Sequence, residues 1–165
     1  MALKLEAKDI LSTPTGNSLK KPKYRIGIDP GVRTGLAEWS EGALHRVETH
    51  TITKAMEVIK ANYPPAETRI FIEDPRKWVN FKGSKPTKET MQRIKGAGSI
   101  TRDASIWEQW FKENGYSDVT WLRPFKDSSK KLDEKTFRKR TGWQDKKRVS
   151  EHARDAAMLV YGRGY

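Results

Sequence analysis

The chain has 165 residues, with 33 Lys or Arg against 21 Asp or Glu, so its formal net charge at pH 7 is +12. This length is expected to form one domain, and 35% hydrophobic residues suffice for a core, which argues against wholesale disorder. The absence of Cys excludes disulfides, thiol nucleophiles and Cys-based zinc sites.

Residues 1–22 are predicted to form a flexible or loosely docked N-terminal arm. They contain Pro14, Gly16 and Pro22 among several Ser, Thr and Lys residues, a composition typical of loops. Residues 1–11 lack the continuous apolar stretch of a signal peptide, and no apolar run approaches the ~20 residues that span a bilayer. We therefore expect a cytoplasmic protein without membrane attachment, whose domain is residues 23–165.

Alternating or apolar segments between turn residues predict five strands. They cover residues 24–28, 35–40, 44–52, 69–73 and 119–122. Helical spacing predicts helices over 54–62, about 89–114 and about 132–140, and a last helix from a Ser150 cap to Tyr161. Three closely linked strands followed by alternating helices and strands predict an α/β domain with a mixed sheet flanked by helices.

The positive charge is concentrated in one segment. Residues 123–148 carry 11 basic and 4 acidic residues, a net +7 and more than half of the total. Phe125, Phe137 and Trp143 are interleaved with these cations, which suits contact with nucleic-acid phosphates and bases. A solvated basic helix that keeps the protein soluble explains the same run. The position of this segment relative to a chemical site has to decide between the two interpretations.

Three acidic residues stand where an ordinary core would not place them. Asp29 and Glu73 each end an apolar strand, and Asp155 lies one turn into the last helix, three residues after His152. A buried carboxylate is costly unless it is paired or binds a metal. If the first and fourth strands are neighbours, Asp29 and Glu73 meet at one edge of the sheet. The last helix can bring His152 and Asp155 to that edge.

These residue types point to metal-dependent hydrolysis. Carboxylates without Cys select a hard cation such as Mg²⁺, for which Mn²⁺ can substitute. Two such ions at the four positions would activate a water against a phosphodiester, and His152 would either bind metal or transfer a proton. Each residue alone also fits an ordinary role, as a strand exit or turn or as a helix start. Their conjunction in this order favours catalysis.

Four segments of the chain resemble one nuclease family, the RuvC-type Holliday junction resolvases of the RNase H-like superfamily. The segments are Arg25-Ile-Gly-Ile-Asp-Pro-Gly31 with Thr34-Gly35, Phe71-Ile-Glu73, Lys95-Gly-Ala-Gly98 and His152-Ala-Arg-Asp-Ala-Ala157. They are similar to the family's first and second acidic strands, the start of its long helix and its C-terminal helix. The resemblance covers residues 24–161 and is closest to phage-encoded members.

The resemblance implies an RNase H-like fold, a homodimer with two active sites, and paired nicks in a four-way DNA junction. It implies Asp29 and Glu73 as metal ligands, with Asp155 completing the acidic set. It also implies a protein of the cytoplasm of a bacterium or a phage-infected host. Family members carry either an acid or a His where His152 stands. Residues 126–148 depart from the compact bacterial pattern as a basic insertion.

Basic and aromatic residues flank the predicted centre in two sets, which we expect to contact DNA. They are Arg76, Lys77, Trp78, Phe81, Lys82 and Lys85 after Glu73, and Lys130, Lys131, Arg138, Lys139, Arg140, Lys146, Lys147 and Arg148 before the last helix. Trp78 or Phe81 could stack on a splayed base, although Trp78 fits packing on the domain or dimer surface equally well. Trp107 and Phe111 fit a core or an interface better than a ligand site.

The sequence thus predicts a metal-dependent, structure-selective endonuclease that resolves branched DNA as a dimer. A related nuclease acting on flaps, forks or RNA–DNA hybrids is the second enzyme interpretation, and a hybrid nuclease must sense the 2′-OH. A non-catalytic branched-DNA-binding protein would keep the fold without the carboxylates. A basic protein of ribosomal type needs no acids at strand ends. Asp29, Glu73 and Asp155 are all present, which favours the nuclease.

Overall fold

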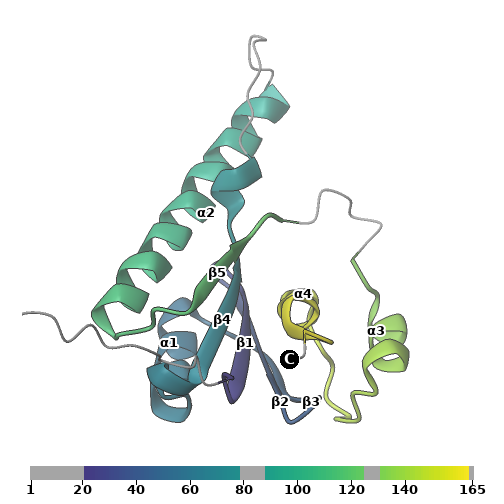
Figure 1. The fold of residues 1–165 in the computed structure, drawn as a ribbon. Helices are drawn as coiled ribbons and strands as arrows, with labels where there is room; N and C mark the ends of the chain where they lie inside the picture. Colours follow the sequence, from purple (N-terminus) through teal and green to yellow (C-terminus); the bar gives the residue numbers. More distant parts are fainter. Residues whose placement is uncertain (1–20, 79–87, 125–130, 164–165) are drawn as a thin grey trace, which may run out of the picture.

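A five-stranded mixed sheet forms the centre of the molecule (Figure 1). The computed structural model describes residues 21–78, 88–124 and 131–163, with the backbone alone for residues 77–78, 88–97 and 99–100. The strands are β1 (Tyr24–Asp29), β2 (Thr34–Ser40), β3 (Ala43–His50), β4 (Thr68–Glu73) and β5 (Val119–Leu122). In the order β3-β2-β1-β4-β5, β2 is antiparallel to both neighbours, and β4 is parallel to both of its own. The predicted mixed sheet is confirmed.

Helices cover both faces of this sheet, which confirms the predicted α/β class. They are α1 (Ile52–Asn62), α2 (Lys88–Glu113), α3 (Glu134–Thr141) and α4 (Glu151–Val160), with two short 3₁₀ turns, η1 (Pro65–Glu67) and η2 (Pro75–Trp78). In Figure 1, α1 and α2 lie to the left of the sheet, and α4 lies to the right with α3 beyond it. Within the described ranges, no helix has both the length and the apolar composition needed to cross a membrane.

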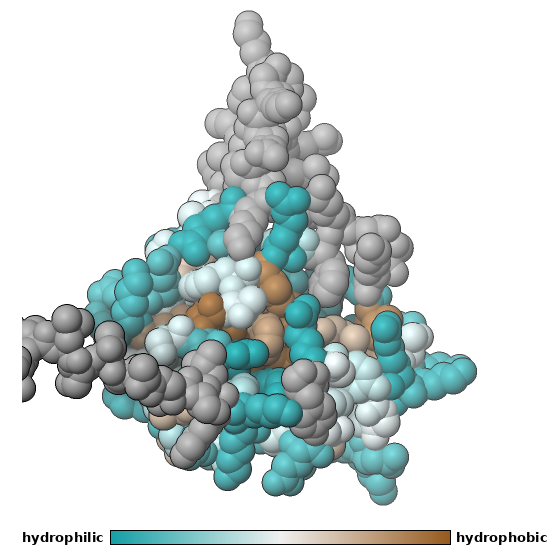
Figure 2. Space-filling view, viewed as in Figure 1, coloured by the Kyte–Doolittle hydropathy of each residue, from teal (hydrophilic) through white to brown (hydrophobic). Residues whose placement is uncertain are grey.

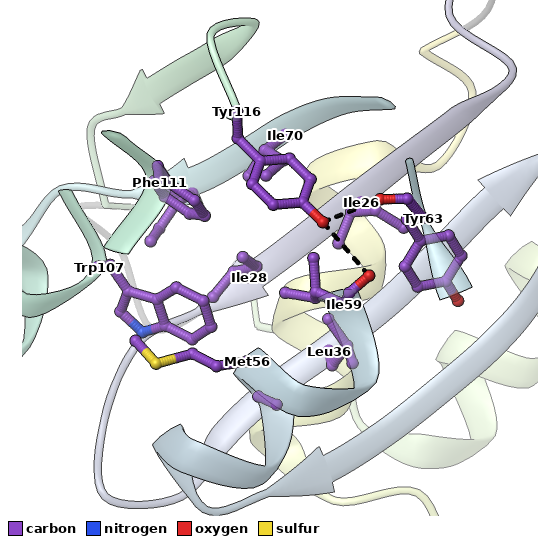
Figure 3. Packing of buried hydrophobic residues seen from close by; sticks show 12 residues of the cluster. Ile26, Ile28, Leu36, Met56, Ile59, Tyr63, Ile70, Trp107, Phe111 and Tyr116 are labelled. Carbon is purple, nitrogen blue, oxygen red and sulfur yellow. Dashed lines mark hydrogen bonds between the residues drawn. The ribbon is translucent and has the colours of Figure 1, made fainter. Parts of the chain in front are cut away.

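The larger core lies between the sheet and the layer of α1 and α2 (Figure 3). Its buried members include Ile26, Ile28, Leu36, Ile59, Ile70, Ile72, Trp107, Phe111 and Tyr116. Each fully buried large apolar side chain contributes about 1.5–3 kcal/mol. Trp107 and Phe111 therefore belong to the core. In the space-filling view of Figure 2, hydrophilic residues lie around the rim and hydrophobic residues are gathered near the middle.

The second core lies under α4, where small residues let the helix come close to the sheet. Ala153, Ala156 and Ala157 face the sheet, and all three are buried. A Cβ at Gly27 of β1 would lie 2.1 Å from the carbonyl oxygen of Ala156, and one at Gly35 of β2 would lie 1.9 Å from that of His152. Both separations are far below van der Waals contact. The helix therefore sits directly on the backbone of two strands.

Local capping residues account for the places where the expected boundaries were wrong. The strand expected to reach residue 52 ends at His50, because the Thr51 side chain caps α1 by accepting a hydrogen bond from the Lys54 amide. The helix expected from residue 132 begins later, because Asp133 caps α3. The expected Ser150 cap of α4 is confirmed. Residues 1–20 of the expected arm lie outside the described residues.

We expect Gly35→Ala to lower the free energy of unfolding by about 3 kcal/mol or more, because the new methyl group must push α4 away from β2. Gly98→Ala is the matched control, since no described atom lies within 4 Å of its Cβ position in α2. It should raise stability by about 0.5–1 kcal/mol through helix propensity. Urea unfolding of both variants provides the measurement. Equal effects of the two substitutions would contradict the close-approach explanation.

Candidate active site

The carboxyl ends of β1 and β4 bring two of the predicted acids side by side. The strands are parallel neighbours in which Ile28 pairs with Ile72, so Asp29 and Glu73 follow at adjacent positions. Successive side chains of a strand alternate between faces. Because Ile28 and Ile72 pack under α1 and α2, Asp29 and Glu73 belong to the face covered by α4. The first and fourth strands are thus neighbours, which is the condition for Asp29 and Glu73 to meet at one edge of the sheet.

The first two turns of α4 supply the other two predicted residues. The Nδ1 atom of His152 lies 2.8 Å from Oδ2 of Asp29, a contact between residues 123 positions apart. Asp155, one turn further along the helix, is only 7% exposed and is close enough for its charge to act on Asp29. The structure thus brings Asp29, His152 and Asp155 together, with Glu73 on the adjoining strand.

Hydrogen bonds in the flanking turns hold these elements in place. The buried Thr34 hydroxyl donates to the Gly31 carbonyl at 2.8 Å and closes the turn that follows Asp29. At the start of α4, the Ser150 hydroxyl accepts from the Ala153 amide at 3.1 Å and also contacts the hydroxyl of Thr49 in β3. The beginning of the helix is therefore attached to the sheet beside Asp29.

Asp29 is an electrostatically strained carboxyl. Burial raises the pKa of Asp29 to about 6, and the neighbouring charge of Asp155 acts in the same direction. The hydrogen bond and charge of His152, and the charge of Lys131, oppose this rise. Carboxyls perturbed by burial and by specific charged neighbours are concentrated at functional sites.

Lys131 is a cation that contacts the acidic residues of the candidate site. Its Nζ atom lies 2.8 Å from Oδ2 of Asp155 and 2.9 Å from Oε1 of Glu151. Although burial opposes the charged form, the hydrogen bonds to Asp155 and Glu151 raise the pKa of Lys131. The sequence predicts Lys131 as a DNA contact, whereas the structure places its ammonium group on the acidic centre.

The donor set fits a hard divalent cation in its chemistry. Carboxylate oxygens and one imidazole at a sheet edge, without sulfur, are ligands that suit Mg²⁺ or Mn²⁺. Among the residues that the structure describes, no three Asp, Glu or His side chains are grouped as ligands of one ion. Two of the oxygens already have partners, since Oδ2 of Asp29 meets His152 and Oδ2 of Asp155 meets Lys131. Metal binding at this site stays a prediction.

Arg76, a predicted DNA contact, has partners within the chain. Its guanidinium donates to Asp74 at 2.7 Å and to Glu108 at 2.8 Å, and it lies 4.8 Å from the ring centroid of Trp121. The contact with buried Asp74 lies within the turn, and the more exposed contact with Glu108 links η2 to α2. The structure therefore gives Arg76 a role in holding the turn after Glu73.

Arg138 also serves the fold. It donates to Glu134 at 2.7 Å, to the Lys147 carbonyl at 2.6 Å and to the Asp145 carbonyl. These bonds connect α3 to the segment that leads into α4. Losing the arginine would therefore loosen the chain in front of the candidate site.

The other predicted DNA contacts fall into two groups. Exposed cations on α3 and on the segment before α4 are Lys139, Arg140, Lys146, Lys147 and Arg148. For Lys77 and Trp78 the backbone alone is described, in η2, and Phe81, Lys82, Lys85 and Lys130 lie outside the described residues. The exposed group remains available for phosphate contacts beside the helix that carries His152 and Asp155.

Two kinds of site residue are hard to recognise in the sequence. Gly27 and Gly35 admit α4 to the sheet, and their only sequence signal is a glycine inside an otherwise apolar strand. Glu151 partners Lys131, but an acid in the first turn of a helix is ordinary. Both roles come from the packing of distant segments.

Comparison with protein-family models and with curated proteins finds no match for this chain. The resemblance to RuvC-type resolvases therefore stays a prediction from the motifs quoted above.

Asp29→Asn should stabilise the protein at neutral pH in the presence of a chelator. The pKa of the Asp29 carboxyl is about 6 in the folded wild-type protein, against about 4 in an unfolded chain. Between these values the folded state binds more protons, so wild-type stability falls as pH rises through this window. The gain from Asp29→Asn should therefore be about 2–3 kcal/mol larger at pH 7.5 than at pH 4.

Urea unfolding at both pH values in EDTA measures this difference. Glu57→Gln, which replaces an exposed carboxylate on α1, serves as the control and should change stability by less than about 0.5 kcal/mol. An Asp29→Asn effect that is the same at pH 4 and pH 7.5 would show that the native carboxyl is not strained.

Proposed function

We propose that the protein is a metal-dependent, structure-selective DNA endonuclease that acts as a homodimer and resolves four-way junctions by paired nicks. The contact between Asp29 and His152 carries this proposal, because it joins a strand-end acid to a helix 123 residues later. Asp155 lies on the same helix, and Glu73 follows at the neighbouring position of the sheet. Four potential ligands on three elements would thus serve one site.

The topology supports a more specific fold assignment. In the order β3-β2-β1-β4-β5, strand β2 runs against the other four strands. This order is compatible with an RNase H-like arrangement, as the motif resemblance implies. The acids at the ends of β1 and β4 would then be the acids of the two family strands that the motifs resemble.

The chain's own residues have distinct tasks in this mechanism. Asp29, Glu73, Asp155 and His152 would hold two Mg²⁺ ions, for which Mn²⁺ could substitute. When bound, such ions polarise the scissile phosphate and activate a water for in-line attack. His152 contacts Asp29 through Nδ1, which leaves Nε2 of a ring that is 45% exposed to bind an ion or to carry a proton. Burial keeps Asp29 oriented for this work.

The exposed cations beside α4 suit the backbone of a branched DNA. They lie on α3 and on the segment that leads into the catalytic helix, so they would hold a DNA arm while its phosphate reaches the acidic edge. Cations of this kind contact phosphates without reading sequence. The proposed enzyme would therefore recognise the shape of the junction through them.

Asp29→Asn should reduce nicking of a labelled four-way junction in Mg²⁺ by about 10³-fold or more. Binding of the junction in Ca²⁺ or EDTA should change by less than about threefold, since Asp29 would contact metal and not phosphate. Glu57→Gln on the opposite face should cut as the wild type does. Persistent cutting by Asp29→Asn, or intact binding without cutting by any protein, would refute the assignment.

Parallel substrates separate the related activities. A resolvase makes symmetric paired nicks in a mobile junction, whereas a flap or fork nuclease cuts one strand and a hybrid nuclease requires the 2′-OH. A preference for flaps or hybrids over junctions would leave the proposed active site unchanged and would refute the four-way junction as the substrate.

Salt dependence should separate phosphate contacts from fold contacts. Lys146→Ala and Lys139→Ala should each lower the slope of log binding constant against log salt by about one unit. Arg138→Ala should instead lower the free energy of unfolding by about 1–3 kcal/mol, because it removes the arginine's hydrogen bonds to two carbonyls and to Glu134, which keeps the Val149 amide as a donor. Filter-binding titrations and urea unfolding measure the two effects, with Lys60→Ala on α1 as the control. A flat salt response of the wild type would contradict the phosphate contacts.

A further inference from the structure

We propose that Lys131 is a built-in counter-ion of the candidate metal centre, which holds Asp155 until a divalent cation displaces it and frees the lysine for DNA. The inference depends on the metal-dependent function proposed above. It extends that function by coupling metal loading to the grip on the substrate.

The contact geometry provides the first argument. The ammonium group of Lys131 lies 2.8 Å from Oδ2 of Asp155, a carboxylate with 7% of its surface exposed. A buried carboxylate of this kind needs a positive partner or a bound metal. Lys131 supplies that charge from outside, because its own side chain is 42% exposed. The lysine reaches into the site and is not enclosed by it.

The charge of the site provides the second argument. Asp155 repels the charge of Asp29, and both carboxyls are buried on the α4 side of the sheet. Lys131 acts on both acids, by direct contact with Asp155 and through its charge on Asp29. His152, which contacts Asp29, also lowers the pKa of that carboxyl. Lys131 therefore balances the acidic pair when no other cation does.

A divalent cation at Asp155 would compete with this lysine. Both need lone pairs of the same carboxylate, and two cations at such close range repel each other strongly. The competitor gains from several carboxylates at once, whereas the ammonium group has Asp155 and Glu151 alone as anionic contacts among the described residues. Metal binding would therefore displace the lysine and bear the energetic cost of that displacement.

The second partner of Lys131 gives the displaced ammonium group a path outward. Glu151 lies 2.9 Å from Nζ, and its side chain is 56% exposed at the start of α4. The long, flexible stem of a lysine allows its charge to move from the buried Asp155 toward the surface. There it would join the exposed cations that precede α4 and be available to a phosphate. Because coupling between binding sites is reciprocal, bound DNA would in turn favour metal binding.

Calorimetric titration of the protein with Mn²⁺ tests the competition without measuring activity. Lys131→Met should bind Mn²⁺ about tenfold more tightly than the wild type, because the competing charge is gone. Lys135→Met removes an exposed charge of the same size from α3 and should stay within about twofold of the wild type, as expected for a screened surface charge. Unchanged or weaker Mn²⁺ binding by Lys131→Met would overturn the inference.

A second measurement uses the wild-type protein, so it does not depend on the folding of a variant. Acetylation by an amine-reactive ester, followed residue by residue with mass spectrometry, should be faster at Lys131 when Mn²⁺ is added and unchanged at Lys135. Equal rates at Lys131 with and without Mn²⁺ would overturn the displacement. A wild type that binds no Mn²⁺ at all would refute the metal-dependent function itself, whereas a binding wild type with an unresponsive Lys131 refutes this inference alone.

Discussion

The close approach of α4 to the backbone of two strands is the constraint on which the candidate site depends. Because Gly27 and Gly35 have no side chains, the helix backbone rests directly against β1 and β2. Without this approach His152 would stand away from Asp29, and the buried face of α4 would lose its contact with the sheet. Small residues on the helix, chiefly alanines, complete the same arrangement from the other side. Packing and chemistry therefore share one requirement, which is a short distance between a helix and a sheet.

That short distance has an electrostatic consequence. It encloses two carboxyls, Asp29 and Asp155, in a space where burial and the charge of Asp155 raise the pKa of Asp29. A protein selected for stability alone would place apolar residues there, since buried polar groups rarely improve on good packing. Here His152 and Lys131 provide partial compensation. A buried carboxyl with a raised pKa, such as that of Asp29, is typical of sites where stability has been exchanged for function.

Much of the fold could be predicted from the sequence because it depends on local signals. Alternation revealed the strands, caps such as Ser150 marked helix ends, and an acid after an apolar strand marked Asp29. The partners of the charged side chains could not be predicted in the same way. Arg76, Arg138 and Lys131 look in sequence like the exposed cations around them, yet each is held by groups from another element. A cation in a sequence carries no sign of whether a distant carboxylate will reach it, because tertiary packing decides that.

The wide separation of Asp29 and His152 along the chain also affects the order in which the molecule is made. During synthesis β1 emerges before α4, and Asp29 lacks its partner His152 until more than a hundred further residues have left the ribosome. Domains form as units once their distant segments are present, so the candidate site can assemble only after α4 has been made. A polypeptide terminated before α4 would carry Asp29 and Glu73 on an uncovered sheet face, without the helix that completes the site. Incomplete chains of this kind would lack His152 and Asp155, two of the four residues of the candidate site.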